Sequence, residues 1–151
     1  MSLLYKVINP PVKALLRSPL HGLMSKNTLL LEFTGRKSGK ALSTPISYHL
    51  SNNAAHCFTN RNFAWWRNLL NGQTVSLRIQ GHTHQSKPQV ETDNLDLMSE
   101  GLEAFLRAVP RDAAHAGVKL DTHGNPNTAD IQRIIADMVY LKFPIEDTHN
   151  E

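Results

Sequence analysis

The turn from Gly35 to Lys40 holds the most concentrated group of cations in the sequence: Arg36, Lys37 and Lys40. Glycines permit positive φ, so such a turn can direct cationic side chains and backbone N–H groups at a phosphate. It is not a nucleotide-binding P-loop, which has four residues between its glycines and Ser or Thr after its lysine. A solvated hairpin tip explains the same residues equally well, so both interpretations stay open.

Both tryptophans of the chain, Trp65 and Trp66, lie in one short segment between Arg61 and Arg67. Adjacent residues of a helix point about 100° apart, so one indole could fill the core while the other lines a cleft. The segment then predicts an aromatic wall for a flat ligand, with the arginines pairing its acidic groups. The alternative is that both indoles plug one end of the core.

The remaining reactive side chains give weaker indications. His82 and His84 would share one face of a strand, and His49 and His56 flank a turn, but no cysteine or carboxylate stands at ligand spacing beside them. Cys57 lies in an apolar strand, where a small core residue is the expected role. We find no hydrolytic triad and no catalytic carboxylate pair, and we expect no metal site.

Composition narrows the class of protein. The 151 residues are 40% hydrophobic and 19% charged, which is typical of one globular domain with one core. A net charge of +3 favours an anionic ligand but is too small to indicate a nucleic-acid partner. A single cysteine excludes an internal disulfide. No secretory signal and no apolar run of about 18 residues are recognisable, so we expect a cytoplasmic protein.

Hydrophobic periodicity predicts a mainly β, α+β domain over residues 1–151. Alternating apolar residues indicate about six antiparallel strands, at 27–34, 44–50, 55–59, 75–80, 83–91 and 139–143, joined by hairpins into a closed or half-closed barrel. Helical spacing indicates short helices at 64–70, after Asp93 or Asn94, and from Asn127 to Met138.

We therefore divide the domain into an N-terminal helical segment (1–26), barrel strands (27–91), a helical segment (92–136) and a final strand (137–144). The N-terminal segment is interrupted by Pro10-Pro11. It could pack on the protein or make peripheral contact with a membrane surface.

Several of these motifs occur in one order: an apolar strand, Thr34-Gly35-Arg36-Lys37-Ser38-Gly39-Lys40, Ser43-Thr44-Pro45, Trp65-Trp66-Arg67-Asn68-Leu69 and Val75-Ser76-Leu77. In this order and spacing the chain resembles the deazaflavin-dependent nitroreductase family, also described as quinone reductases, best over Leu29 to Ile79. The resemblance implies the split β-barrel of FMN-binding proteins, with helices packed outside it.

The resemblance also implies an oxidoreductase that transfers a hydride from reduced coenzyme F420, an 8-hydroxy-5-deazaflavin, to a quinone, a nitro compound or an activated alkene. The coenzyme performs the chemistry, while the protein binds it, orients it and excludes water. The expected partner is a small-molecule electron acceptor. Because dimers are common for this fold, a homodimer is a further expectation.

By the same resemblance, Arg36, Lys37 and Ser38 would hold the phosphate and acidic tail of the coenzyme. Residues that would line its ribityl chain or ring, or border the pocket, are Ser43, Thr44, Pro45, Thr59, Asn60, Arg61, Trp65, Trp66 and Asn68.

Two alternatives stay open. The same barrel could hold FMN or haem instead, because one fold supports several cofactors. A non-enzymatic binding module could use the basic residues on an acidic ligand, and its binding would then depend steeply on salt. The chemistry requires no acid–base residue. Tyr48 or Tyr140 could donate a proton to the acceptor, although packing explains each equally well.

Overall fold

The computed structural model describes residues 27–146, so the N-terminal helical segment (1–26), with its two alternatives of packing on the protein or contacting a membrane surface, lies outside the described residues. The strands are β1 (Thr28–Thr34), β2 (Ala41–Ser47), β3 (His49–Ser51), β4 (Ala54–Asn60), β5 (Val75–Ile79), β6 (His82–Ser86), β7 (Gln89–Glu91) and β8 (Met138–Pro144). The helices are η2 (Trp65–Asn71), α3 (Leu95–Ala108), α4 (Arg111–Ala116), α5 (Thr128–Ile134) and η3 (Ile135–Asp137), where η denotes a 3-10 helix. None of these helices is long and apolar enough to cross a bilayer.

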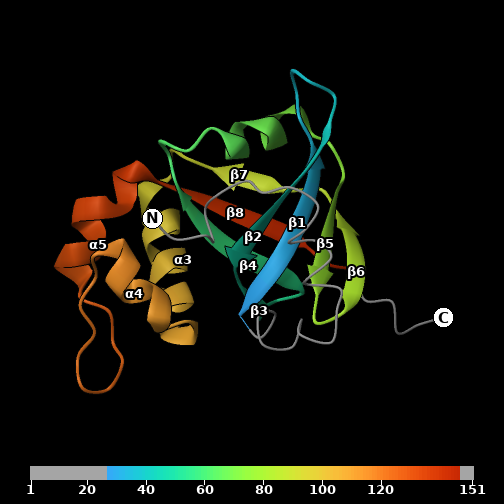
Figure 1. Cartoon of the computed structure of the whole chain (residues 1–151). Helices are drawn as coiled ribbons and strands as arrows, with labels where there is room; N and C mark the ends of the chain where they lie inside the picture. The colour runs from blue at the N-terminus through green and yellow to red at the C-terminus, as the bar shows by residue number, and fades with distance from the viewer. Residues whose placement is uncertain (1–26, 147–151) are drawn as a thin grey trace.

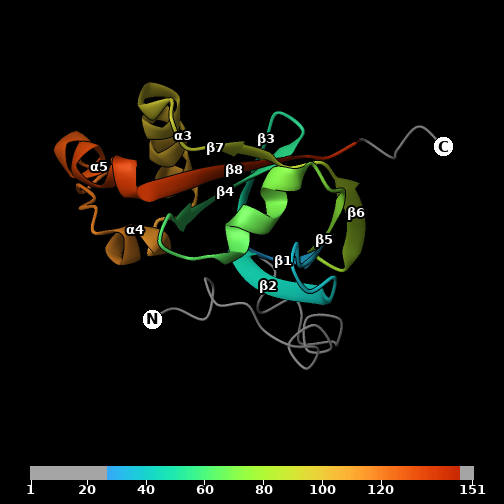
Figure 2. The ribbon, with the colours of Figure 1, turned by 90° about the horizontal axis from the view of Figure 1, so that it is seen from above.

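Within residues 27–146, the strands form two antiparallel sheets of four, ordered β2-β1-β5-β6 and β3-β4-β8-β7. The sheets are the two walls of a barrel, and α3, α4 and α5 lie outside it against the second sheet (Figure 1). Seen from above, η2 lies across one end of the barrel, between the walls (Figure 2). The predicted α+β fold, an antiparallel split barrel with helices outside it, is confirmed.

Two of the predicted strands are each divided between the two sheets. The strand expected over 44–50 runs from β2 in one sheet to β3 in the other, and the strand expected over 83–91 becomes β6 and β7. These crossings join the walls of the barrel at its corners. Alternation along an unbroken strand over 44–50 predicts that Leu50 shares the buried face of Ile46 and Tyr48. That prediction is wrong: Leu50 is 56% exposed, because the chain has changed sheets before it.

The second sheet separates two buried clusters, one inside the barrel and one beneath the helices. Alternation along β8 illustrates the division, because Val139 and Leu141 point into the barrel while Met138 and Tyr140 pack toward the helices. The basic turn and η2 belong to the barrel, whereas the helical layer covers only the far wall.

The helix starts follow their predicted caps. Asn94 caps α3 and Asn127 caps α5, and each side chain accepts a hydrogen bond from the backbone N–H three residues ahead. Met138, expected on the inner face of the last helix, instead begins β8, because η3 ends the helical segment earlier. α4, between Pro110 and Gly117, matches no individually predicted helix, since six residues give little periodicity.

Gly101 provides a test of how closely α3 packs on the barrel. A Cβ at this position would lie 2.6 Å from Cε2 of Tyr140, so α3 or the ring would have to shift. Although alanine favours a helix by about 1 kcal/mol over glycine, overpacking costs about 1–3 kcal/mol. We expect Gly101→Ala to lower the free energy of unfolding measured in urea. Glu100→Ala, at an exposed position of α3, is the control and should change it by less than about 0.5 kcal/mol. Equal stabilities of the two variants would contradict the close packing.

Candidate functional site

The turn between β1 and β2 is closed by its own hydrogen bonds. The Gly35 N–H donates to the Lys40 carbonyl (2.9 Å), and the Gly39 N–H donates to the Gly35 carbonyl (2.9 Å). The Lys40 N–H donates to Ser38 Oγ (3.2 Å). Gly39 has φ +69°, and a Cβ on Gly35 would lie 2.7 Å from Ser38 Oγ, so both glycines are required by this geometry.

Two backbone amides at the tip of the turn have no acceptor in the described part of the chain. The Arg36 N–H donates to Asn68 Oδ1 (2.8 Å), whereas the N–H groups of Lys37 and Ser38 donate to no acceptor among residues 27–146. The side chains of Arg36 and Lys37 are exposed beside them. Adjacent free amides next to cations are the donors that bind phosphate groups, so the turn can hold an anion.

The tryptophans of η2 are both core residues. Trp65 and Trp66 are only 4% and 5% exposed, and the ring of Trp65 lies 6.2 Å from that of Phe33. Trp66 Nε1 donates to the Arg61 carbonyl (3.1 Å), and the Arg67 guanidinium stacks on the Trp66 ring at 4.7 Å. The structure therefore favours the plugged barrel end over an open aromatic wall. Any contact between these indoles and a coenzyme stays a prediction.

Two side-chain amides connect η2 to the turn. Asn68 accepts the bond from Arg36, and its Nδ2 donates to the Trp65 carbonyl (2.8 Å). Gln73, just after η2, accepts from the Thr34 N–H (2.8 Å) and donates to the carbonyls of Thr34 (3.0 Å) and Asn68 (2.8 Å). Gln73 was not among the predicted site residues, because an isolated glutamine belongs to no motif and its partner Thr34 is 39 positions away.

The predicted residues at the end of β4 reach the same end of the barrel, since they lead directly into η2. Thr59 is fully buried, and its Oγ1 has no hydrogen-bond partner in the described part of the chain. Asn60 Oδ1 accepts from the Asn62 N–H (2.8 Å). The Arg61 guanidinium donates to the Thr92 carbonyl, which restrains its position.

Ser43, Thr44 and Pro45 lie in β2, a short distance below the turn. Ser43 pairs with Glu32 and Thr44 with Leu31 across the ladder. Alternation along the strand puts Thr44 on the barrel side, whereas Ser43 and Pro45 are on the opposite face. All three residues are buried, so they lie next to the turn without adding to its exposed surface.

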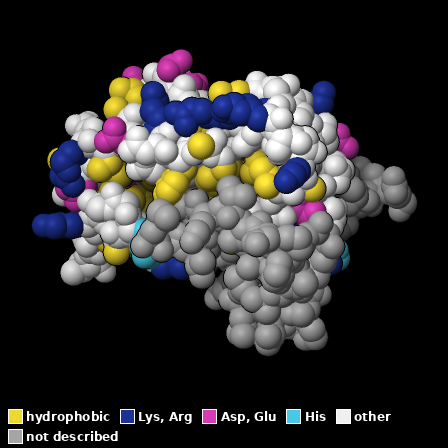
Figure 3. Space-filling model, turned by 45° about the horizontal axis from the view of Figure 1, so that its top comes forward, with side chains coloured by type: hydrophobic (Ala, Val, Ile, Leu, Met, Phe, Trp, Pro, Cys, Tyr) yellow, Lys and Arg dark blue, Asp and Glu magenta, His cyan; other side chains and the backbone are white. Residues whose placement is uncertain are grey.

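Figure 3 shows the end of the barrel where the turn and η2 lie. Lys and Arg side chains gather there in a row beside hydrophobic side chains. The structure thus brings together the residues of the turn, of the end of β4 and of η2, and it gives this end a positive charge.

The two candidate proton donors lie in different places. Tyr48 is inside the barrel cluster, and burial raises the pKa of its phenol. The Tyr140 phenol lies beneath α3, 2.5 Å from His56 Nδ1, and His56 Nε2 lies 3.0 Å from the Ser51 carbonyl. A carbonyl only accepts, so Nε2 carries a hydrogen; in the neutral imidazole Nδ1 is then the acceptor and the phenol donates to it. Burial also raises the pKa of Tyr140.

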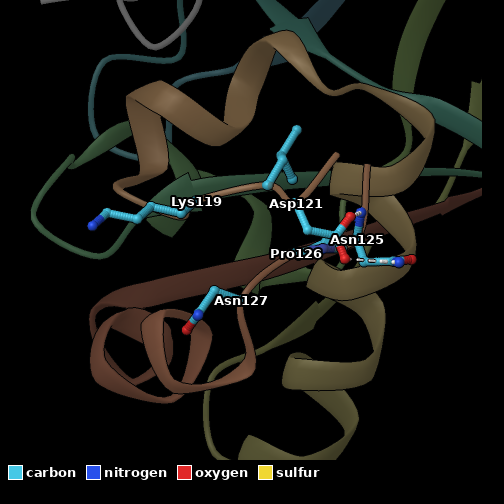
Figure 4. Close-up of a pocket in the computed structure, with 6 residues that line it drawn as sticks. Lys119, Asp121, Asn125, Pro126 and Asn127 are labelled. Atoms are coloured by element: carbon cyan, nitrogen blue, oxygen red, sulfur yellow. Dashed lines mark hydrogen bonds between the residues drawn. The ribbon is translucent and has the colours of Figure 1, made fainter. Parts of the chain in front are cut away.

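Hollows lined by described residues also occur on the helical side, away from this end. One, of about 340 Å³, is lined by residues 119–121 and 125–127 (Figure 4). The polar groups in it are used internally: Asp121 accepts from the Asn125 N–H (2.9 Å) and from Asn125 Nδ2 (3.0 Å). It contains none of the predicted site residues and offers few free groups to a ligand.

The bond between Tyr140 and His56 can be tested by a double-mutant cycle. Tyr140→Phe leaves a buried acceptor on His56 without its donor, so we expect the free energy of unfolding to fall by about 1 kcal/mol. In a His56→Leu background the same change should have almost no effect, since the acceptor is gone. Chemical denaturation of the four proteins measures this coupling, and additive losses would show that the phenol does not donate to His56.

Comparison with known proteins identifies the fold and the family. No curated protein matches the chain in sequence. A structure described as an F420-H2 dependent reductase has 16% identity and a TM-score of 0.51, covering 78% of this chain and 94% of its own. An FMN-binding, pyridoxamine 5'-phosphate oxidase-related protein of Nostoc punctiforme has 12% identity and a TM-score of 0.55, covering 91% and 81%. An Agrobacterium tumefaciens protein of unknown function has 13% identity and a TM-score of 0.56; the match covers 93% of this chain but only 58% of the other.

At these identities the structural matches establish the fold alone. The family is established by sequence: the family model F420H(2)-dependent quinone reductase matches residues 18–97, more than half of the chain, including the basic turn, η2 and the strands between them. The chain therefore belongs to the F420H2-dependent quinone reductase family, which is a family of oxidoreductases.

Proposed function

We propose that the protein binds reduced coenzyme F420 with its phosphate at the turn between β1 and β2, and that it reduces a quinone, a nitro compound or an activated alkene. The observation that supports this most strongly is the pair of free amides on Lys37 and Ser38, in a turn that also presents cations. The family description and one structural relative, both named for F420H2 dependence, support the same coenzyme.

In this proposal the chain's own residues bind and orient. The Lys37 and Ser38 amides and the side chains of Arg36 and Lys37 hold the phosphate, since charge-assisted hydrogen bonds are the strongest available there. Arg61, which is restrained by the Thr92 carbonyl, supplies positive charge for the acidic tail. When bound, the coenzyme supplies the hydride, and the buried end of the barrel limits access of water behind it.

Ser43, Thr44 and Pro45 are proposed to border the ribityl chain or the ring, and Thr59 and Asn60 to complete that border from β4. The buried, unpartnered Oγ1 of Thr59 is a hydroxyl that a polar group of the coenzyme could satisfy. Trp65 and Trp66 support this site from the core, because their burial fixes η2 across the end of the barrel.

We expect the double variant Arg36→Ala, Lys37→Ala to bind oxidised F420 at least about tenfold more weakly without losing its fold, because two charge-assisted contacts are removed. Fluorescence titration measures the Kd. Lys87→Ala with Lys119→Ala is the control, since it removes the same charge from exposed positions outside the site and should leave the Kd unchanged.

Parallel titrations with FMN and haem decide between cofactors. Preferential binding of FMN or haem would indicate that the protein uses that cofactor on the same fold. If none of the three cofactors binds, and acidic ligands bind with an affinity that falls steeply with salt, the non-enzymatic binding module is favoured. Oxidation of the reduced coenzyme by quinones, nitroaromatics and activated alkenes, compared by kcat/KM, identifies the acceptor class. Light scattering of the same protein tests the expected homodimer, and vesicle flotation decides whether its N-terminal segment contacts a membrane surface.

A further inference from the structure

We propose that Gln73 and Asn68 are positioning residues, which hold the phosphate-binding turn in its working geometry without contacting the coenzyme themselves. This inference deepens the proposed function and rests on it. It assigns a role to Gln73, which no motif indicated, and it replaces the coenzyme contact that the sequence predicted for Asn68.

The Gln73 side chain pairs with the last residue of β1 in the way that the backbone of a neighbouring strand would. Its Oε1 accepts from the Thr34 N–H (2.8 Å) and its Nε2 donates to the Thr34 carbonyl (3.0 Å), so one amide pairs with both backbone groups of the last residue of the strand. The second hydrogen of Nε2 serves the Asn68 carbonyl (2.8 Å). These three bonds use Oε1 and both hydrogens of Nε2, so the amide group has no donor left for a ligand.

Asn68 continues the connection into the turn itself. Its Oδ1 accepts from the Arg36 N–H (2.8 Å), and its Nδ2 donates to the Trp65 carbonyl inside η2 (2.8 Å). Arg36 therefore contributes its side chain but not its amide to an anion, and the free amides begin at Lys37. The geometry fixes where those amides stand relative to η2 and to the Arg61 and Arg67 side chains around it.

If Gln73 is a positioning residue, its loss should weaken binding of the phosphate group and leave binding of the deazaflavin ring unchanged. If Gln73 only stabilised the fold, its loss would weaken binding of every ligand of the barrel alike. If it holds the turn, its loss should weaken ligands that carry the phosphate and spare those that lack it. The ribityl deazaflavin without phosphate and tail is the probe that separates these outcomes.

The test uses Gln73→Met, which keeps the length of the side chain and removes all three bonds. Gln85→Met is the matched control, because Gln85 also makes a side-chain hydrogen bond, to Ser76 Oγ (2.8 Å), but on the outer face of the β5–β6 pair. We expect Gln73→Met to raise the Kd for F420 roughly tenfold, about 1.4 kcal/mol by the relation of Kd to free energy. The Kd for the phosphate-free deazaflavin should stay unchanged, and Gln85→Met should change neither.

Amide hydrogen exchange provides a readout that needs no ligand. In Gln73→Met the amides of Thr34 and Arg36 should exchange faster than in the wild type, while in Gln85→Met they should not. Equal weakening of both ligands, or no change in either Kd, overturns the inference while the wild type still binds F420. If the wild type binds no deazaflavin, the proposed function fails. Unchanged amide exchange at Thr34 and Arg36 in Gln73→Met would separately overturn the positioning role.

Discussion

The hydrogen bonds that close the β1–β2 turn on itself and on η2 determine what the site can bind. Within the described chain, the amides of Gly35, Arg36, Gly39 and Lys40 already have acceptors, which leaves those of Lys37 and Ser38 to a ligand. A turn without these bonds would have to be ordered during binding, at a cost of about 1–2 kcal/mol per residue. The bonds therefore make the cationic turn a preorganised anion site.

The barrel supplies the frame for those bonds. β1 and β2 stay paired from Thr28–Ser47 to Thr34–Ala41, so the turn can only emerge at one end of the barrel. The buried indoles of Trp65 and Trp66 hold η2 across the same end, which brings Asn68 within reach of Arg36. Core packing and phosphate binding are thus connected, because the residues that plug the barrel also fix the backbone of the turn.

The sequence predicts the local parts of this arrangement well. Alternating residues give the strands, the glycines and cations give the turn, and the ordered motifs give the family. It could not predict the change of sheet after Tyr48, since periodicity does not reveal which strand is a neighbour. The bonds from Gln73 to Thr34 and from His56 to Tyr140 join residues 39 and 84 positions apart, and single glutamines and histidines carry no pattern that indicates such partners.

The placement of the phosphate can be observed directly by titrating ¹⁵N-labelled protein with F420 and following the backbone amide signals. Binding at the turn should move the amides of Lys37 and Ser38 most, downfield as they gain an acceptor, with smaller shifts along η2. The phosphate-free deazaflavin should leave these two signals almost in place. If F420 binds while the largest shifts lie elsewhere, for example in residues 119–127, the turn is not the phosphate site.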